Sequence, residues 1–362
     1  MPLFDAYWQQ PLKEQGEKPK DWPHLWKDLQ PSSCASCHQE QHQAWQHSLH
    51  ANAFSPGLYG QFSTMSAREA NACLNCHTPL AEQKFSTDLS LKDSLKTPQK
   101  HALRKAGVSC AGCHVRKWQR FGPPPKGSNQ EGLFKTGVHG GFIASKDFEK
   151  STFCASCHQF PKSWGTVNGK AMENTLNEWK ASRFAKENVH CQNCHMPERK
   201  HLFKGIHDSK MTRKGLKIKV FKRKEGAELS LTSEWIGHAF PTYITPKVYV
   251  QAIATSKDGT DLQAWEWVIF RDVRFNQAWV EKSDTRLMPN ETRRYVVKQL
   301  PAQTTQLIFR IRVEPDFYYK GLYKNLLTFT KDQKALSQLR EALSLTYKND
   351  YTLFEQTLLF KP

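Results

Sequence analysis

The chain contains no run of apolar residues long enough to cross a bilayer, and none of its cysteines is spare. Only 38% of its 362 residues are hydrophobic. Side chains alone would therefore build a thin core for a chain of this length. Because all ten cysteines belong to one repeated motif, a lipid-bearing cysteine is excluded.

Each cysteine lies in a pentapeptide of the form C-x-x-C-H. The cysteine pairs are Cys34 and Cys37, Cys73 and Cys76, Cys110 and Cys113, Cys154 and Cys157, and Cys191 and Cys194. The histidines that directly follow them are His38, His77, His114, His158 and His195. This spacing indicates covalent attachment of c-type haem, because two thiols three positions apart reach the two vinyl groups on one porphyrin edge. The histidine then serves as the proximal ligand of the iron.

A disulfide framework or a pair of zinc sites would also use cysteines in pairs. Neither explains why histidine follows the second cysteine in all five pentapeptides. The sequence therefore predicts five c-type haems, and these apolar discs would supply the apolar mass that the side chains lack.

Thioether attachment of haem takes place outside the cytoplasm, so we expect a periplasmic or extracellular protein. The first 30 residues are polar and rich in proline, and they contain no apolar signal-peptide segment. We therefore expect the numbering to begin after a signal peptide has been removed. We also expect no membrane span.

The formal net charge is +18, and lysines and arginines gather in the run Lys210–Lys224. Haem propionates offset part of this charge, which weakens any case for nucleic-acid binding. We interpret the run as a solvated surface that also neutralises propionates. The alternative is that this basic run steers the protein electrostatically toward an acidic redox partner.

The pattern along the chain predicts an α+β fold with four parts. Short helices and loops are expected in the haem region, including helices near Gln39–Ser48 and Ala171–Ala185, with Gly- and Pro-rich loops at Phe121–Gly132 and Thr136–Gly141. Alternating apolar residues from Leu216 onward predict a small antiparallel β-sandwich, and leucines predict a last helix over Lys331–Tyr347. The four ranges are an irregular arm at 1–32, a pentahaem domain at 33–212, the β-sandwich at 213–330, and the helix and tail at 331–362.

The far side of each iron decides the chemistry of its haem, because a second ligand closes the iron and an open position makes it reactive. Ten of the fifteen histidines remain as candidates for this distal position. Met196 directly follows a proximal histidine and is too close to reach over that same haem. Five closed haems would need five of the ten histidines.

The segment Cys34–Phe54 resembles the multihaem cytochrome family typified by the nitrifier tetrahaem carrier, which accepts electrons from hydroxylamine oxidoreductase. Gly107–His114 and Glu178–His207 are similar to further motifs of that family, and Gly237–Thr242 resembles a stretch in β-domains appended to such proteins. This chain has five pentapeptides where that family has four. The roles of individual haems in the family therefore cannot be assigned to individual haems of this chain.

The resemblance and the local context together rank the distal candidates. His50 has the family's spacing from the first pentapeptide, and His201 and His207 follow the last one. His139 lies among glycines that allow close approach to a porphyrin, and His238 would bring the β-domain over a haem. A strand-end histidine bonded to backbone is the alternative for His238. The other five, His24, His42, His47, His101 and His190, are interpreted as surface or propionate-bonding groups.

Electron transfer between redox proteins is the function that these features favour. An alternative is an oxidoreductase in which one open haem acts on a small nitrogen or sulfur compound. Pentahaem nitrite reductases resemble the chain in haem number but use a C-x-x-C-K site, whereas every pentapeptide here ends in histidine. A second alternative is a subunit of an extracellular haem-chain assembly, joined by the aromatic N-terminal arm.

Overall fold

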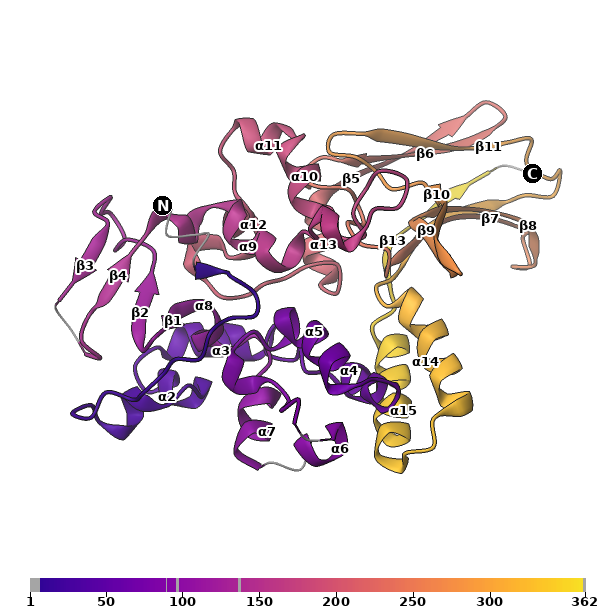
Figure 1. The fold of residues 1–362 in the computed structure, drawn as a ribbon. Helices are drawn as coiled ribbons and strands as arrows, with labels where there is room; N and C mark the ends of the chain where they lie inside the picture. The colour runs from indigo at the N-terminus through magenta and orange to yellow at the C-terminus, as the bar shows by residue number, and fades with distance from the viewer. Residues whose placement is uncertain (1–6, 89, 96–97, 136–137, 361–362) are drawn as a thin grey trace. The chain divides into compact units, whose positions relative to one another are not determined.

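The computed structural model describes residues 7–88, 90–95, 98–135 and 138–360. Residues 1–6 of the predicted arm and 136–137 of the predicted loop lie outside this range. The chain divides into two compact units. Unit 1 comprises Met1–Cys157, His190–Lys204 and Leu326–Ala342, and unit 2 comprises His158–Val189, Gly205–Asn325 and Leu343–Pro362. The mixture of helices and antiparallel sheets confirms the predicted α+β class (Figure 1).

Unit 1 is built mainly from short helices. The α-helices are α2 (Pro31–Ala35), α3 (Gln39–Gln46), α4 (Pro56–Gln61), α5 (Ala67–His77), α6 (Leu91–Ser94), α7 (Pro98–Lys105), α8 (Cys110–His114), α9 (Ser151–His158, whose last residue is assigned to unit 2) and α12 (Cys191–His195). The 3-10 turns are η1 (His24–Lys27), η2 (Phe62–Thr64), η3 (Ala81–Gln83), η4 (Lys146–Glu149) and η6 (Pro197–Arg199).

Four of the five pentapeptides end a helix, because α5, α8, α9 and α12 each finish on the histidine that follows the second cysteine. The first one differs, since Cys34 lies near the end of α2 and His38 directly precedes α3. Helix α5 begins with a reciprocal cap in which Ser66 accepts from the backbone of Glu69 and the Glu69 carboxylate accepts from the backbone of Ser66. Local sequence signals therefore place most attachment motifs on helical turns.

A small sheet with strand order β1-β2-β4-β3 follows α8 in unit 1. Its strands are β1 (Val115–Arg116), β2 (Gln119–Gly122), β3 (Gly132–Phe134) and β4 (Phe142–Ala144). The sequence predicted loops for much of this stretch. The strands have two to four residues each, which is too short for an alternating pattern to show.

The N-terminal arm packs on the haem-bearing part of unit 1. The Tyr7 hydroxyl donates to the carbonyl of Cys113 at 2.6 Å, and the Arg116 side chain donates to the carbonyl of Tyr7 at 3.0 Å. The Gln10 amide donates to the carbonyl of Ser156 at 3.3 Å. Burial raises the pKa of the Tyr7 hydroxyl well above its ordinary value. Because the Gln10 amide also donates to the carbonyl of Asn75 at 3.5 Å, the arm reaches residues inside three of the pentapeptides.

Unit 2 contains two antiparallel sheets that form the predicted sandwich. One has the order β11-β6-β5 and the other β13-β12-β7-β8, and Figure 1 shows them as two layers. The strands are β5 (Leu216–Arg223), β6 (Gly226–Ser233), β7 (Lys247–Thr255), β8 (Asp261–Ile269), β11 (Thr292–Lys298), β12 (Gln306–Glu314) and β13 (Tyr351–Leu359), with a separate hairpin of β9 (Arg271–Asn276) and β10 (Ala278–Asp284).

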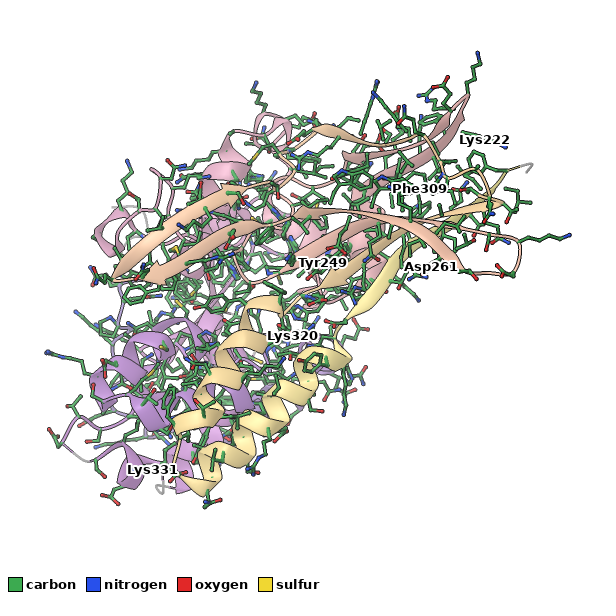
Figure 2. All side chains as sticks on the ribbon, turned by 90° about the vertical axis from the view of Figure 1, so that its right-hand side faces the viewer. Lys222, Tyr249, Asp261, Phe309, Lys320 and Lys331 are labelled. Atoms are coloured by element: carbon green, nitrogen blue, oxygen red, sulfur yellow. The ribbon has the colours of Figure 1, made fainter. Side chains whose placement is uncertain are left out.

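The core of unit 2 lies between these two sheets. Leu229 and Leu231 of β6 and Val250 of β7 belong to one buried cluster, and each of their side chains is 0% exposed. Phe309 of β12 belongs to the same cluster and is labelled in Figure 2. Because β12 alternates buried and partly buried residues, its period-two sequence pattern predicted both the strand and the face that it buries.

Short helices precede the sandwich in unit 2. They are η5 (Lys162–Trp164), α10 (Thr175–Lys180), α11 (Arg183–Lys186) and α13 (Ser209–Gly215). The single helix predicted over Ala171–Ala185 is broken, and α10 ends where Ser182 turns back on Trp179. Both the backbone nitrogen and the hydroxyl of Ser182 donate to the Trp179 carbonyl, at 2.9 Å and 2.7 Å.

Two helices close the fold, α14 (Phe317–Phe329) and α15 (Gln333–Lys348). The predicted last helix is present as α15, but its buried face differs from the leucine stripe. Ala335, Leu339, Ala342 and Thr346 are buried, whereas Leu345 is 41% exposed. These four residues are spaced along one face of the helix and form its buried side. No described helix has the length and apolar character that a membrane crossing requires.

Candidate haem-binding sites

All ten cysteines are free thiols, and Cys37 is exposed while the other nine are partly buried. The thiols therefore form no disulfide framework. Among the described residues, no group of three or more His, Cys, Asp or Glu side chains is arranged to hold a metal ion, so the zinc alternative also finds no support. Free, accessible thiols are what covalent haem attachment requires.

Thiols from different pentapeptides contact one another in unit 1. Cys34 and Cys110 share a hydrogen bond, which joins the first pentapeptide to the third. Cys76 and Cys157 join the second to the fourth in the same way, and Cys154 and Cys191 join the fourth to the fifth. The thiol of Cys154 also lies within electrostatic reach of Cys113, in the third pentapeptide. The five attachment positions thus form one connected set, with the fourth as its junction.

These contacts change the acidity of the thiols in opposite directions. The hydrogen bond from Cys154 lowers the pKa of Cys191 to about 7, and the hydrogen bond from Cys110 lowers the pKa of Cys34. The same two contacts raise the pKa of Cys154 and of Cys110. Burial raises the pKa of Cys113 to about 11. One thiol of each contacting pair is therefore the more readily ionised and the more nucleophilic.

Four of the five proximal histidines have the Nδ1 atom of the ring held by an oxygen. Nδ1 lies 2.9 Å from the carbonyl of Ala53 in His77 and 2.7 Å from the carbonyl of Phe121 in His114. In His195 it lies 2.5 Å from the carbonyl of Lys204. In His158 the partner is the hydroxyl of Tyr243.

A ring that donates from Nδ1 leaves Nε2 with a free lone pair, which is the arrangement that a metal-ligating histidine needs. Burial lowers the pKa of His114 to about 4, and burial also lowers the pKa of His77. These rings are therefore neutral at pH 7, and the neutral imidazole is the form that binds iron. The side chains present fit c-type haem.

His50, the first of the five distal candidates, lies against the segment that leads into the third pentapeptide. Its carbonyl accepts from the backbone of Val108 at 2.8 Å, and its ring centroid is 4.3 Å from that of Phe203. Gly107 has a φ of +58°, and a Cβ there would lie 2.4 Å from the His50 carbonyl. Only glycine allows this approach, so Gly107 fixes where His50 sits relative to α8.

His201 and His139 lie in the same unit, and both are electrostatically linked to His38. The His201 ring centroid is 6.1 Å from that of His114, and its Nδ1 lies 3.1 Å from the carbonyl of Arg199. Nδ1 of His139 lies 3.2 Å from the carbonyl of Gly141. Both rings therefore present Nε2, close to the first and third pentapeptides.

His207 and His238 lie in unit 2 and differ in which ring nitrogen is held. Nδ1 of His238 lies 2.9 Å from the carbonyl of Ala239. In His207 it is Nε2 that contacts the Asp316 carboxylate, at 3.0 Å. Burial raises the pKa of Asp316, but hydrogen bonding to His207 outweighs it and lowers that pKa overall. The distal roles of all five histidines stay predictions.

Sequence reasoning missed two side chains beside the attachment residues. Tyr243 directly follows the stretch Gly237–Thr242 that the sequence singled out, so proximity to that motif was the available signal. Lys84 is electrostatically linked to the thiols of Cys76 and Cys157, and burial lowers its pKa to about 7. No local pattern distinguishes Lys84 from the many lysines on the surface.

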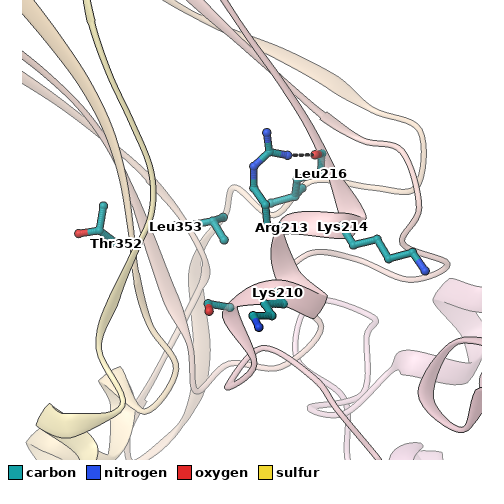
Figure 3. Close-up of a pocket in the computed structure, with 7 residues that line it drawn as sticks. Lys210, Arg213, Lys214, Leu216, Thr352 and Leu353 are labelled. Carbon is teal, nitrogen blue, oxygen red and sulfur yellow. Dashed lines mark hydrogen bonds between the residues drawn. The ribbon is translucent and has the colours of Figure 1, made fainter.

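The basic run predicted at Lys210–Lys224 borders a hollow of about 560 Å³ in unit 2. Figure 3 shows Lys210, Arg213 and Lys214 of α13 on one side of it and Thr352 and Leu353 of β13 on the other. The Arg213 guanidinium donates to the carbonyl of Leu216 at 3.0 Å. Lys210 and Lys214 add positive charge to the helix that borders the hollow.

Comparison with known proteins bears on the cofactor. Residues 33–115, which contain the first three pentapeptides, match the family model described as "Cytochrome c554 and c-prime". The cofactor is c-type haem. The protein described as "Cytochrome c-552" from Aliarcobacter butzleri is 23% identical over 176 residues, which cover 46% of this chain and 35% of that protein. The chain thus spans about a third of this curated relative.

A solved structure extends the likeness to nearly the whole chain. The penta-heme cytochrome c552 from Thermochromatium tepidum superimposes with a TM-score of 0.63 at 18% identity, covering 92% of this chain and 99% of that one. At this identity the likeness concerns the fold. The comparisons support kinship with multihaem c-type cytochromes, whereas the specific likeness to the nitrifier carrier remains a prediction.

Proposed function

We propose that the chain is a multihaem cytochrome that binds five haems and transfers electrons between redox proteins in the periplasm or outside the cell. The observation that carries the proposal is the connected set of attachment cysteines in unit 1. Bound haem supplies an iron that alternates between ferric and ferrous states, so haems held at adjoining positions pass single electrons.

The residues of the chain have separate tasks in this proposal. Each cysteine pair would fix one haem edge, and four of the five proximal histidines have Nδ1 against an oxygen, the arrangement in which Nε2 would face the iron. His50, His139, His201 and His238 would close the far side of four irons. The likeness to the nitrifier tetrahaem carriers suggests a soluble redox partner, and the basic hollow beside α13 favours an acidic one.

One observation favours a second candidate function. Nε2 of His207 contacts the Asp316 carboxylate, so the nitrogen that would ligate iron already has a partner. If His207 ligates no iron, the remaining four candidates leave one of the five irons open. Such a haem would let the protein act as an oxidoreductase on a small nitrogen or sulfur compound.

Electron paramagnetic resonance of the oxidised protein separates the two functions. Electron transfer alone predicts only low-spin ferric signals, unchanged by cyanide or nitrite. A substantial high-spin signal that responds to either ligand would overturn the carrier proposal and support the oxidoreductase. His207→Ala serves as a companion variant, because it leaves every haem low-spin if His207 is not a ligand.

His238→Ala tests the part assigned to the β-sandwich unit. We expect one haem to change from low-spin to high-spin, because the variant removes one of the proposed distal ligands. Full retention of the low-spin signals would show that His238 caps no haem. His24→Ala is the matched control, since His24 was interpreted as a surface group.

A further inference from the structure

The proximal histidine of the fourth pentapeptide has a partner of a different kind from those of His77, His114 and His195. Those three rings contact backbone carbonyls, whereas Nδ1 of His158 contacts the phenolic oxygen of Tyr243. The two rings also lie nearly parallel, with an interplanar angle of 16° and centroids 6.2 Å apart. Tyr243 therefore limits the rotation of the His158 ring.

The segment that carries Tyr243 is held by a buried carboxylate. Oε2 of Glu178 accepts from the backbone of Ala239 at 3.1 Å and from the hydroxyl of Thr242 at 2.9 Å. The hydroxyl of Thr242 also lies 2.7 Å from that of Thr175, so two side chains of α10 hold the residue next to Tyr243. These contacts fix the backbone from which the Tyr243 ring projects.

A buried arginine completes this support. The Arg286 side chain is 0% exposed, and it donates to Oε1 of Glu178 at 2.9 Å and to the carbonyl of Thr242 at 2.8 Å. Arg286 also makes two hydrogen bonds to Asp284, at 2.8 Å and 2.9 Å. Buried charges that are paired and fully hydrogen-bonded hold a rigid geometry. Tyr243 is thus placed by a network that extends well beyond the tyrosine itself.

We propose that Tyr243 is a positioning residue for the haem of the fourth pentapeptide, where it orients His158 and sets the reduction potential of that haem. The inference rests on the proposed function, because it assumes that His158 ligates haem iron. An acceptor at Nδ1 makes the imidazole a better electron donor, which stabilises the ferric state and lowers the potential. A phenolic oxygen is a weaker acceptor than a backbone carbonyl, so this haem is tuned differently from the others.

The reduction potential of the fourth haem would affect electron transfer between the other haems, because the fourth pentapeptide lies beside several others. Its cysteines contact thiols of the second and fifth pentapeptides and lie within electrostatic reach of the third. A change at this junction alters transfer along every path that crosses it. Tyr243 would therefore influence electron flow although it lies outside every attachment motif.

Tyr243→Phe in the full haem-loaded protein tests the inference, because it removes the hydroxyl and keeps the ring. We expect one midpoint potential to become more positive in a spectroelectrochemical titration, and one set of low-spin resonance signals to shift. The other midpoints should stay unchanged. Tyr295→Phe is the matched control, since Tyr295 is a buried tyrosine of the same unit that packs against Trp267 in the sandwich core.

Unchanged midpoints and unchanged low-spin signals in Tyr243→Phe would overturn the inference. Thr242→Val gives a second test, because it keeps Tyr243 and removes the hydroxyl that bonds Glu178 and Thr175. A shift of the same haem supports the inference, and a change spread over several haems contradicts it. A ligand-sensitive high-spin signal in the unaltered protein would defeat the carrier proposal while leaving a Tyr243→Phe shift intact, so the two failures are distinguishable.

Discussion

The two units are of similar length but build their interiors differently. Unit 2 contains one buried apolar cluster of 17 residues that joins both sheets of its sandwich. Among the described residues, the two clusters in unit 1 have only five buried residues each, and one of them contains Phe62 and Leu74. Because unit 1 holds the attachment cysteines, haem has to supply the apolar volume that its side chains do not.

The two units also differ in how exposed their ion pairs are. In unit 2 the guanidinium of Arg271 is 0% exposed and pairs with Glu281 at 2.7 Å, and Arg286 is buried against Glu178. In unit 1 the ion pairs Lys150–Asp147 and Arg199–Glu149 lie at the surface. Unit 2 folds around its own side chains and can bury ion pairs among them. The two ion pairs named in unit 1 lie away from the interior that haem would fill.

The largest effect should come from withholding haem. In a chain produced without haem attachment, we expect unit 1 to lose its ordered structure, because its side-chain clusters are too small to offset the conformational entropy of folding. The strands of the unit 2 sandwich should keep their protection. Hydrogen–deuterium exchange resolved by peptide checks this, with the haem-loaded chain as control. Equal protection in both units would show that unit 1 does not depend on haem.

The next effect comes from the side-chain core of unit 2. Phe309→Ala should lower the free energy of unfolding of the sandwich by about 3–5 kcal/mol, because it leaves a cavity at a position that is 0% exposed. Haem signals should be unaffected. Denaturant unfolding followed by far-ultraviolet circular dichroism, together with haem absorbance, measures both properties.

Phe62→Ala is the matched variant in unit 1. Phe62 is 2% exposed, and it shares a cluster with Leu74 of α5, the helix that ends in the second pentapeptide. We expect this variant to alter the haem absorbance as well as stability. If Phe309→Ala disturbed the haems as much as Phe62→Ala does, the two interiors would not be independent in the way the comparison requires.

A smaller effect is expected from the ionic network of unit 2. Burial raises the pKa of Asp284, but hydrogen bonds from Arg286 and Lys170 outweigh it and hold that pKa well below its usual range. A lowered folded-state pKa adds stability above the unfolded value near pH ~4, and this is lost only as pH falls through the folded value. Asp284→Asn should therefore cost about 2 kcal/mol at pH 7 and progressively less in strong acid. Urea midpoints measured across acid pH would refute this if the cost stayed constant.

The sequence was most informative where chemistry or periodicity is local. The C-x-x-C-H spacing indicated the haem cofactor, although it did not predict that four pentapeptides end helices, and the alternation at Leu307–Val313 marked β12 and its buried face. Both signals depend on neighbours within a few positions. The α+β class and the c-type haem cofactor followed from them directly.

What the sequence could not show depends on contacts between distant positions. Tyr243 meets His158 from 85 positions away, and Cys34 meets Cys110 from 76 positions away. The break at Ser182 and the exposure of Leu345 likewise follow from which surface each helix meets. Composition and motif spacing do not identify contacts between positions that are distant in the sequence.

The smallest effect should come from a surface pair of unit 1. The Lys150 ammonium lies 2.9 Å from the Asp147 carboxylate, but its side chain is 53% exposed, so solvent screens the attraction. Lys150→Ala should change the free energy of unfolding of the haem-loaded protein by less than about 1 kcal/mol, and the difference should shrink as salt is added. Denaturant unfolding at low and high salt measures both properties. A larger or salt-independent loss would mean that unit 1 draws on its side-chain charges as unit 2 does, and the contrast between the two interiors would then fail.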